Sequence, residues 1–157
     1  MLDAFEVPVE DDGVMGVVEP GNVHWYEEYP GNPLYPHVLN GMIAALWGLR
    51  DLFVLNADAR AKKLFDAGVD SIARALPRFD TGYWSLYSLA GSRGAYLASM
   101  KYHAVHITQL RILAAQTGRA ELQATADRFV GYARNPLNRI HAAAAFAGAK
   151  IKYKFRG

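Results

Sequence analysis

Apolar residues recur at helical spacing over four long segments of this chain, and these segments constrain the fold more than any other feature. The first segment follows Pro36 and ends near Asn56. The second ends at Pro77, with Leu64, Gly68, Ile72, Ala75 and Leu76 on one face and charged residues largely on the other. A period of three to four residues over such lengths predicts helices. The stripe of the first segment consists of Leu39, Met42, Ile43, Leu46, Leu49 and Phe53.

The other helical segments run from about 100 to 117 and from about 120 to 134, with Gly118 between them. An alanine-rich segment after Pro136 is predicted to be helical as well. Helices joined by short connections pack as antiparallel neighbours. The pattern therefore predicts a mainly α fold of antiparallel helix pairs. A length of 157 residues, 52% of them hydrophobic, predicts that residues 1–157 form a single domain.

Two stretches outside the helices are predicted to form short β-hairpins. Near the N-terminus, "FEVPVE" alternates apolar and polar residues, "DDG" supplies a turn, and "VMGVV" runs back to a second turn at "EPGN". Between the second and third helices, "RFDTGYWSLYSLAGSRG" combines a turn with a short aromatic run. A lone hairpin is marginally stable. We therefore expect that the domain lacks an N-terminal part or completes itself as a homo-oligomer.

Composition excludes several classes of function. The chain has no cysteine, which excludes disulfides, thiolate metal sites and a cysteine nucleophile. It has no glycine-rich phosphate loop and no GxSxG motif. The N-terminus lacks the pattern of a signal peptide, and no apolar run reaches the roughly 18 residues of a membrane span. As it stands, the sequence predicts a cytoplasmic protein without a membrane span.

Charge is distributed unevenly, although the net charge is only +2. No Lys or Arg precedes Arg50, and no Asp or Glu follows Asp127. The basic tail "NRIHAAAAFAGAKIKYKFRG" has two interpretations. It could bind a polyanion, such as nucleic acid or an acidic polysaccharide, or it could be a solvated end that pairs with the acidic N-terminal segment.

Two groups of residues could carry chemistry. Tyr102, His106 and Gln109 share one face of the third helix, and His103 lies at the edge of its apolar stripe. These histidines lack a third ligand at a convincing spacing, so no metal is predicted; the alternative is hydrogen bonding near the core. The second group is the Glu27–Glu28 pair in the proline-rich loop "HWYEEYPGNPLYP". Adjacent side chains of an extended segment point to opposite sides, so we expect one glutamate to face any given pocket.

Six ordered blocks resemble one enzyme family, the D-glucuronyl C5-epimerases, in their C-terminal domain. This family converts D-glucuronic to L-iduronic acid units within a glycosaminoglycan such as heparan sulfate. The resemblance runs from about Gly13 to Leu113. The blocks are "WYEEYP" (25–30), "VLNG" (38–41), "GLRDL" (48–52), "LPRFDTG" (76–82), "SLYSL" (85–89) and "YHAVHITQL" (102–110).

The resemblance implies a partial α/α toroid whose aromatic connections form the floor of a sugar-binding cleft. It implies no cofactor, and its partner is an acidic polysaccharide containing glucuronic acid rather than nucleic acid. We add Trp25 and His106 as candidate substrate-binding residues. The family's functional residues match Glu28, Tyr29, Asn40, Tyr87 and Tyr102.

Inversion at C5 removes a proton α to a carboxylate and returns one to the opposite face, so two acid/base groups must flank the sugar. Cationic or hydrogen-bonding groups must also hold the substrate carboxylate. The sequence departs from the family here, because Ser88, Leu89 and Ala90 replace the acidic and arginine residues that follow the matched tyrosine. Arg93 is a candidate replacement. A polysaccharide lyase, a non-catalytic polysaccharide-binding module and a helical interaction module remain as alternatives.

Overall fold

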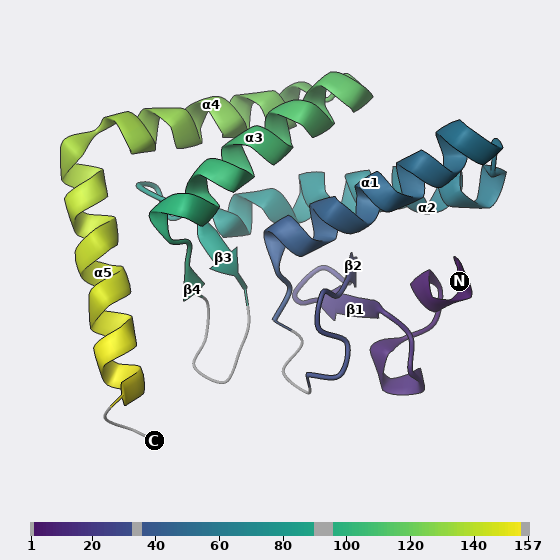
Figure 1. The fold of residues 1–157 in the computed structure, drawn as a ribbon, viewed down its shortest axis with the longest axis horizontal. Coiled ribbons are helices and arrows are strands. Elements are labelled where there is room, and N and C mark those ends of the chain that lie inside the picture. The colour runs from purple at the N-terminus through teal and green to yellow at the C-terminus, as the bar shows by residue number, and fades with distance from the viewer. Residues whose placement is uncertain (1, 33–35, 90–95, 155–157) are drawn as a thin grey trace.

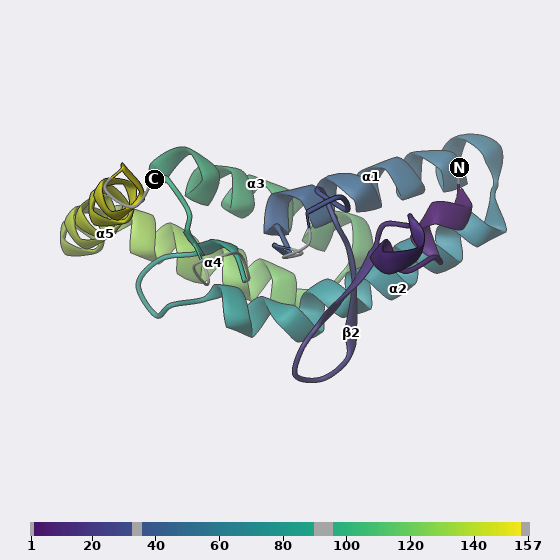
Figure 2. The same ribbon diagram turned by 90° about the horizontal axis from the view of Figure 1, so that it is seen from below.

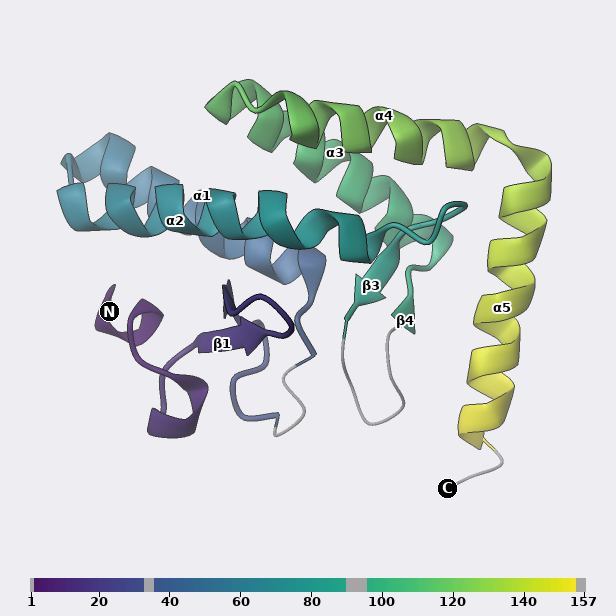
Figure 3. The ribbon, with the colours of Figure 1, turned by 180° about the vertical axis from the view of Figure 1, so that it is seen from behind.

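The structure is a computed structural model that describes residues 2–32, 36–89 and 96–154, with side chains up to residue 146. Two helix pairs lie side by side, and both small sheets lie on the same side of them (Figures 1 and 3). The described helices are α1 (Leu39–Asn56), α2 (Ala59–Ala75), α3 (Met100–Thr117), α4 (Ala120–Arg134) and α5 (Pro136–Lys154), and the strands are β1 (Met15–Val18), β2 (Val23–Tyr26), β3 (Leu86–Ser88) and β4 (Tyr96–Leu97).

The predicted mainly α fold is confirmed, with α1 packed on α2, α3 on α4, and small sheets among the connections. Local signals place the helix ends. Asp58 caps α2 by accepting hydrogen bonds from the first-turn N–H groups, and Ser99 caps α3 by accepting one from Tyr102 N–H. Gly118 ends α3 with a φ of +71°, a left-handed conformation that glycine adopts at little cost. The short turn Leu76–Phe79 continues α2 as a 3₁₀ helix through Pro77.

The core lies between the helix pairs and the first sheet. Its fully buried side chains include Trp25 of β2, which stacks on Phe79 with ring centroids 5.5 Å apart. The helices contribute their apolar faces, as the sequence predicted. The larger fully buried helical side chains are Leu39, Met42, Ile43, Leu46, Leu49, Ile72, Leu110, Leu113 and Phe129.

The predicted N-terminal hairpin was wrong in its first strand, while the predicted strand in "VMGVV" is confirmed as β1. "FEVPVE" contains no strand; the segment has two 3₁₀ turns, Leu2–Phe5 and Val9–Asp11, and meets β1 at one parallel bridge from Pro8. The observed hairpin begins at β1, which pairs in antiparallel fashion with β2 through the turn "EPGN". Gly21 and Asn22 have positive φ angles there, a conformation that these two residue types tolerate.

The acidic N-terminal segment pairs with α2 rather than with the basic tail. Asp3 and Glu6 both form ion pairs with Arg60. Figure 2 shows α5 at the opposite end of the molecule from the N-terminal turns. The interpretation in which the tail pairs with the N-terminal segment was therefore wrong.

Gly68 marks the closest approach of α2 to α1 and β2. A Cβ at this position would lie 2.3 Å from Leu46 Cδ2 and 3.0 Å from Tyr26 Cε2. We expect Gly68→Ala to lower the free energy of unfolding by about 1–3 kcal/mol, because the added methyl group overpacks the core. Urea denaturation measures the change.

Gly48→Ala is the matched control, since Gly48 lies inside α1 with no atom within 4 Å of an added Cβ. We expect this change to raise stability by about 0.5–1 kcal/mol through helix propensity. Equal stability of the two variants would contradict the packing described here.

Candidate functional site

The two adjacent glutamates of the loop after β2 face opposite sides, as the sequence predicted. Glu27 is buried. Its Oε2 accepts a hydrogen bond from the His37 backbone N–H at 3.1 Å, and its Oε1 contacts His37 Nδ1. Glu28 is exposed and lies against Gly41 in the first turn of α1, where an added Cβ would be 2.4 Å from Glu28 Oε2. One glutamate therefore closes the loop internally, and the other faces outward.

Three tyrosines from different elements meet beside Glu28. Tyr29, the next residue of the loop, interacts through its side chain with Glu28 and with Tyr87 of β3. The Tyr87 ring packs edge-on against Tyr102 of α3, with centroids 4.8 Å apart and an interplanar angle of 67°. Four predicted catalytic residues thus lie in one cluster, which we call the tyrosine–glutamate cluster.

Backbone pairing explains why the loop meets β3. Val38 forms an antiparallel bridge with Ser88, and the Leu89 N–H donates to the Pro36 carbonyl at 3.1 Å. The end of the loop therefore runs beside the strand that carries Tyr87. Segments that are some fifty residues apart in the sequence become neighbours through this pairing.

The environment of the cluster favours protonated phenols. The side-chain interaction with Glu28, followed by the charge on that carboxylate, raises the pKa of Tyr29. Burial is the largest cause that raises the pKa of Tyr87, followed by the charge on Glu28. Both phenols are therefore proton donors at neutral pH, next to a carboxylate that can accept a proton.

A cavity of about 220 Å³ opens beside this cluster. Tyr87 and Tyr102 line it, so two of the four residues face this cavity. A second cavity of about 320 Å³ shares Ser99 and Phe146 with the first and extends between the start of α3 and α5. The remaining lining residues of the first cavity are Tyr96, Leu97, Ser99 and Phe146.

The predicted substrate-binding residues occupy different positions. Asn40 is half-buried next to Gly41, and its backbone carbonyl accepts a hydrogen bond from Gln109 Nε2 at 3.2 Å. His106 is fully buried one helical turn from Tyr102. Trp25 is also fully buried, so its side chain belongs to the core. Arg93 lies outside the described residues.

Sequence reasoning missed a buried hydrogen-bond network next to the cluster. Ser85 Oγ lies 2.8 Å from His103 Nδ1 and 3.0 Å from His106 Nδ1. His103 Nε2 lies 2.9 Å from the Phe129 carbonyl, and Trp84 stacks on the His103 ring at 3.8 Å. The interpretation of the two histidines as hydrogen-bonded near the core is confirmed. The serine carried no sequence signal, because only the fold brings it to them.

Comparison with known proteins assigns this chain to a protein family. The family described as "D-glucuronyl C5-epimerase C-terminus" matches residues 1–131. The chain belongs to the D-glucuronyl C5-epimerase C-terminal family. It is 40% identical over 147 residues to the D-glucuronyl C5-epimerase of Caenorhabditis elegans, and 34% identical over 120 residues to an uncharacterized protein of Methanocaldococcus jannaschii.

These alignments cover most of this chain but only part of each relative. They include 84% and 74% of the chain, against 23% of the C. elegans protein and 37% of the M. jannaschii protein. The tyrosine–glutamate cluster lies within the residues that the epimerase family matches.

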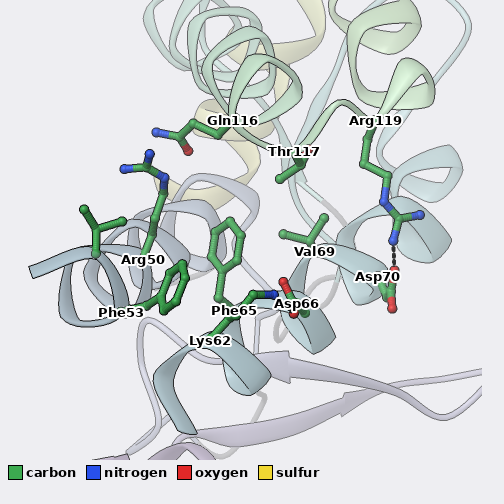
Figure 4. A pocket seen from close by; sticks show the side chains of 11 residues that line it. Arg50, Phe53, Lys62, Phe65, Asp66, Val69, Asp70, Gln116, Thr117 and Arg119 are labelled. Carbon is green, nitrogen blue, oxygen red and sulfur yellow. Dashed lines mark hydrogen bonds and ion pairs between the residues drawn. The ribbon is translucent and has the colours of Figure 1, made fainter. Parts of the chain in front are cut away.

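A different cavity of this epimerase-family domain lies near the C-terminal ends of α1 and α3, whereas the tyrosine–glutamate cluster lies near their N-terminal ends (Figure 4). It measures about 370 Å³ and is lined by both cationic and anionic side chains. Lys62 pairs with Asp66, and Arg119 pairs with Asp70. Because these two pairs neutralise four of the five charged lining residues, all except Arg50, and no tyrosine lines the cavity, we do not choose it as the candidate site.

Among the described residues, no group of three His, Asp or Glu side chains is placed to hold a metal ion. No helix in the described part of the chain is long and apolar enough to cross a membrane.

The buried histidines predict loss of stability in acid. Burial lowers the pKa of His103, and burial lowers that of His106 to about 3. A histidine with a lowered pKa in the folded state binds protons better when unfolded, so its stabilising effect is lost as pH falls below about 6.5. We expect His106 to contribute a slope of up to about 1.4 kcal/mol per pH unit between the unfolded pKa and about 3.

Urea denaturation at a series of pH values between 7 and 5 measures this slope for His106→Gln. We expect the variant to show a shallower slope than the parent chain, whatever its stability at pH 7. His24→Gln is the control, since His24 is exposed and should leave the slope unchanged. A slope for His106→Gln that equals the parent's would contradict the assignment.

Proposed function

We propose that this chain is a uronyl C5-epimerase domain that acts on D-glucuronic acid units of an acidic polysaccharide. The observation that carries the proposal is the convergence of Glu28, Tyr29, Tyr87 and Tyr102 beside a cavity, in a chain of the epimerase family. The name of the C. elegans relative supports the same reaction class.

The chemistry of the cluster suits a proton transfer at carbon. Removal of the C5 proton creates charge on the adjacent carboxylate, and reprotonation must occur from the other face. Glu28 supplies a proton acceptor, while the raised pKa values of Tyr29 and Tyr87 keep two proton donors beside it. Tyr102 lines the cavity with Tyr87 and completes the acid/base and positioning set.

The larger assembly is part of this proposal. We infer that the two helix pairs are a portion of an α/α toroid, with further helices supplied by additional chain or by a second copy. Asn40 and His106 would support the sugar from the side of α1 and α3. The polysaccharide would reach the tyrosine–glutamate cluster along the two cavities that share Ser99 and Phe146.

Deuterium incorporation at C5 tests the reaction. The protein is incubated in D₂O with a glucuronate-containing polysaccharide, and the product is analysed by NMR. We expect exchange by the parent chain, and a loss of about 10²-fold or more in Tyr102→Phe with polysaccharide binding retained, because the phenol hydroxyl is the group removed.

Tyr83→Phe is the matched control, because the Tyr83 ring stacks on His141 outside the cluster, with centroids 4.3 Å apart. We expect it to keep full exchange. No exchange by the parent chain, with binding retained, would favour a non-catalytic binding module. Shortened chains with an unsaturated, ultraviolet-absorbing end would instead identify a lyase.

A further inference from the structure

The imidazole of His106 has one ring nitrogen that no described residue satisfies. His106 Nε2 is buried without a hydrogen-bond partner in the described part of the chain, and so is Gln109 Oε1. These residues are three positions apart on α3, so their side chains are neighbours on one face. Buried polar atoms are normally paired with protein or ordered water. The positions of the hydrogens in this network decide whether His106 Nε2 and Gln109 Oε1 need a hydrogen-bond donor or an acceptor.

The proton on His103 can be assigned from its partners. A carbonyl oxygen only accepts, so His103 Nε2 must carry the hydrogen that it donates to Phe129 at 2.9 Å. The pKa of His103 is lowered by burial, which keeps the ring neutral and leaves a lone pair on Nδ1. The Ser85 backbone N–H points at this nitrogen from 3.2 Å.

The hydroxyl of Ser85 then determines the state of His106. Ser85 Oγ is 2.8 Å from the lone pair of His103 Nδ1. If the hydroxyl hydrogen pointed elsewhere, two lone pairs would face each other at this distance, so Ser85 must donate to His103. Its oxygen is left to accept at 3.0 Å from His106 Nδ1, which therefore carries the hydrogen. The other ring nitrogen of His106, Nε2, carries no hydrogen and is therefore a hydrogen-bond acceptor.

Gln109 is fixed by the same reasoning. Its Nε2 donates to the backbone carbonyl of Asn40 at 3.2 Å, and because that carbonyl cannot donate, the amide is not flipped. Oε1 is therefore the free acceptor. His106 Nε2 and Gln109 Oε1 form two buried acceptors without a donor among the described residues.

We propose that His106 Nε2 and Gln109 Oε1 form a buried acceptor site that binds an O–H donor, either an internal water molecule or a hydroxyl group of a bound sugar. One water can donate both of its hydrogens to two acceptors and is commonly found between such groups. On α3, His106 lies one helical turn after Tyr102, and Gln109 is held beside Asn40 by its hydrogen bond to the Asn40 carbonyl.

The polarity of this site restricts any acidic sugar. Two acceptors repel a carboxylate, so a uronic acid would present a hydroxyl to α3 and turn its carboxylate away. This consequence for the sugar rests on the proposed function. The acceptor site itself follows from the hydrogen-bond directions and does not depend on it.

NMR of the ¹⁵N-labelled protein tests the site directly. Long-range ¹H–¹⁵N correlations report which nitrogen of each histidine is protonated. We expect the hydrogen on Nε2 in His103 and on Nδ1 in His106, together with a cross-peak between the His106 ring and a long-lived water. A hydrogen on His106 Nε2 would overturn the proposal, as would the lack of any O–H contact in both the free and sugar-bound protein.

Ser85→Ala tests the relay, since it removes the oxygen that accepts from His106. We expect the His106 hydrogen to move to Nε2 in a substantial fraction of molecules. Ser71→Ala, a buried serine of α2, should leave the tautomer unchanged. An unchanged tautomer in a folded Ser85→Ala protein would overturn the relay, and the wild-type spectrum decides the matter if that variant does not fold.

A glucuronate-containing oligosaccharide distinguishes the two sources of the hydroxyl. Replacement of the water cross-peak by a contact from the sugar identifies the sugar hydroxyl as the donor in the complex. Persistence of the water cross-peak identifies water as the donor in both states. Absence of oligosaccharide binding would overturn the proposed function, while the tautomer and water contact would still support the acceptor site.

Discussion

The contact between Glu27 and His37 is the interaction on which the candidate site depends. Both carboxylate oxygens of Glu27 meet His37, one at its backbone N–H and one at its ring. This contact closes the loop after β2 over a buried carboxylate, which is costly to bury without a partner. Once Glu27 points inward, the alternation of the extended chain directs Glu28 outward. His37 has a φ of +49°, an uncommon conformation for this residue type that the closed loop maintains.

The site contains two kinds of polar environment a short distance apart. In the tyrosine–glutamate cluster, exposed or half-buried phenols lie near one carboxylate, and the pKa values of Tyr29 and Tyr87 are raised. Behind it, the buried imidazoles of His103 and His106 are neutral and are oriented by Ser85. In the proposed function, the first environment exchanges protons with the sugar in the cavity, and the second presents fixed acceptors. An enzyme that inverts a carbon centre requires both mobile protons and a rigid frame for the substrate.

Helical periodicity and the residues that start or end helices predicted the helices well. Apolar stripes are local signals, and so are residues such as Asp58, Pro77 and Gly118. The N-terminal hairpin was misplaced because the alternation in "FEVPVE" competes with two tight turns, whose stability depends on contacts with β1 and α2. Residue matches to the family singled out Glu28, Tyr29, Tyr87 and Tyr102, which lie near one another in the structure and whose catalytic roles are proposals. The roles of Trp25 and Ser85 could not be predicted from the sequence. The burial of Trp25 and the contacts of Ser85 with the histidines both arise from tertiary packing.

The central claim is that the phenols of Tyr29, Tyr87 and Tyr102 meet although they come from a loop, a strand and a helix. NOE spectroscopy on protein with selectively labelled tyrosine measures this contact most directly. The account predicts cross-peaks that connect the Tyr87 ring to both the Tyr29 and the Tyr102 rings. Three rings with contacts only to residues nearby in sequence would contradict it.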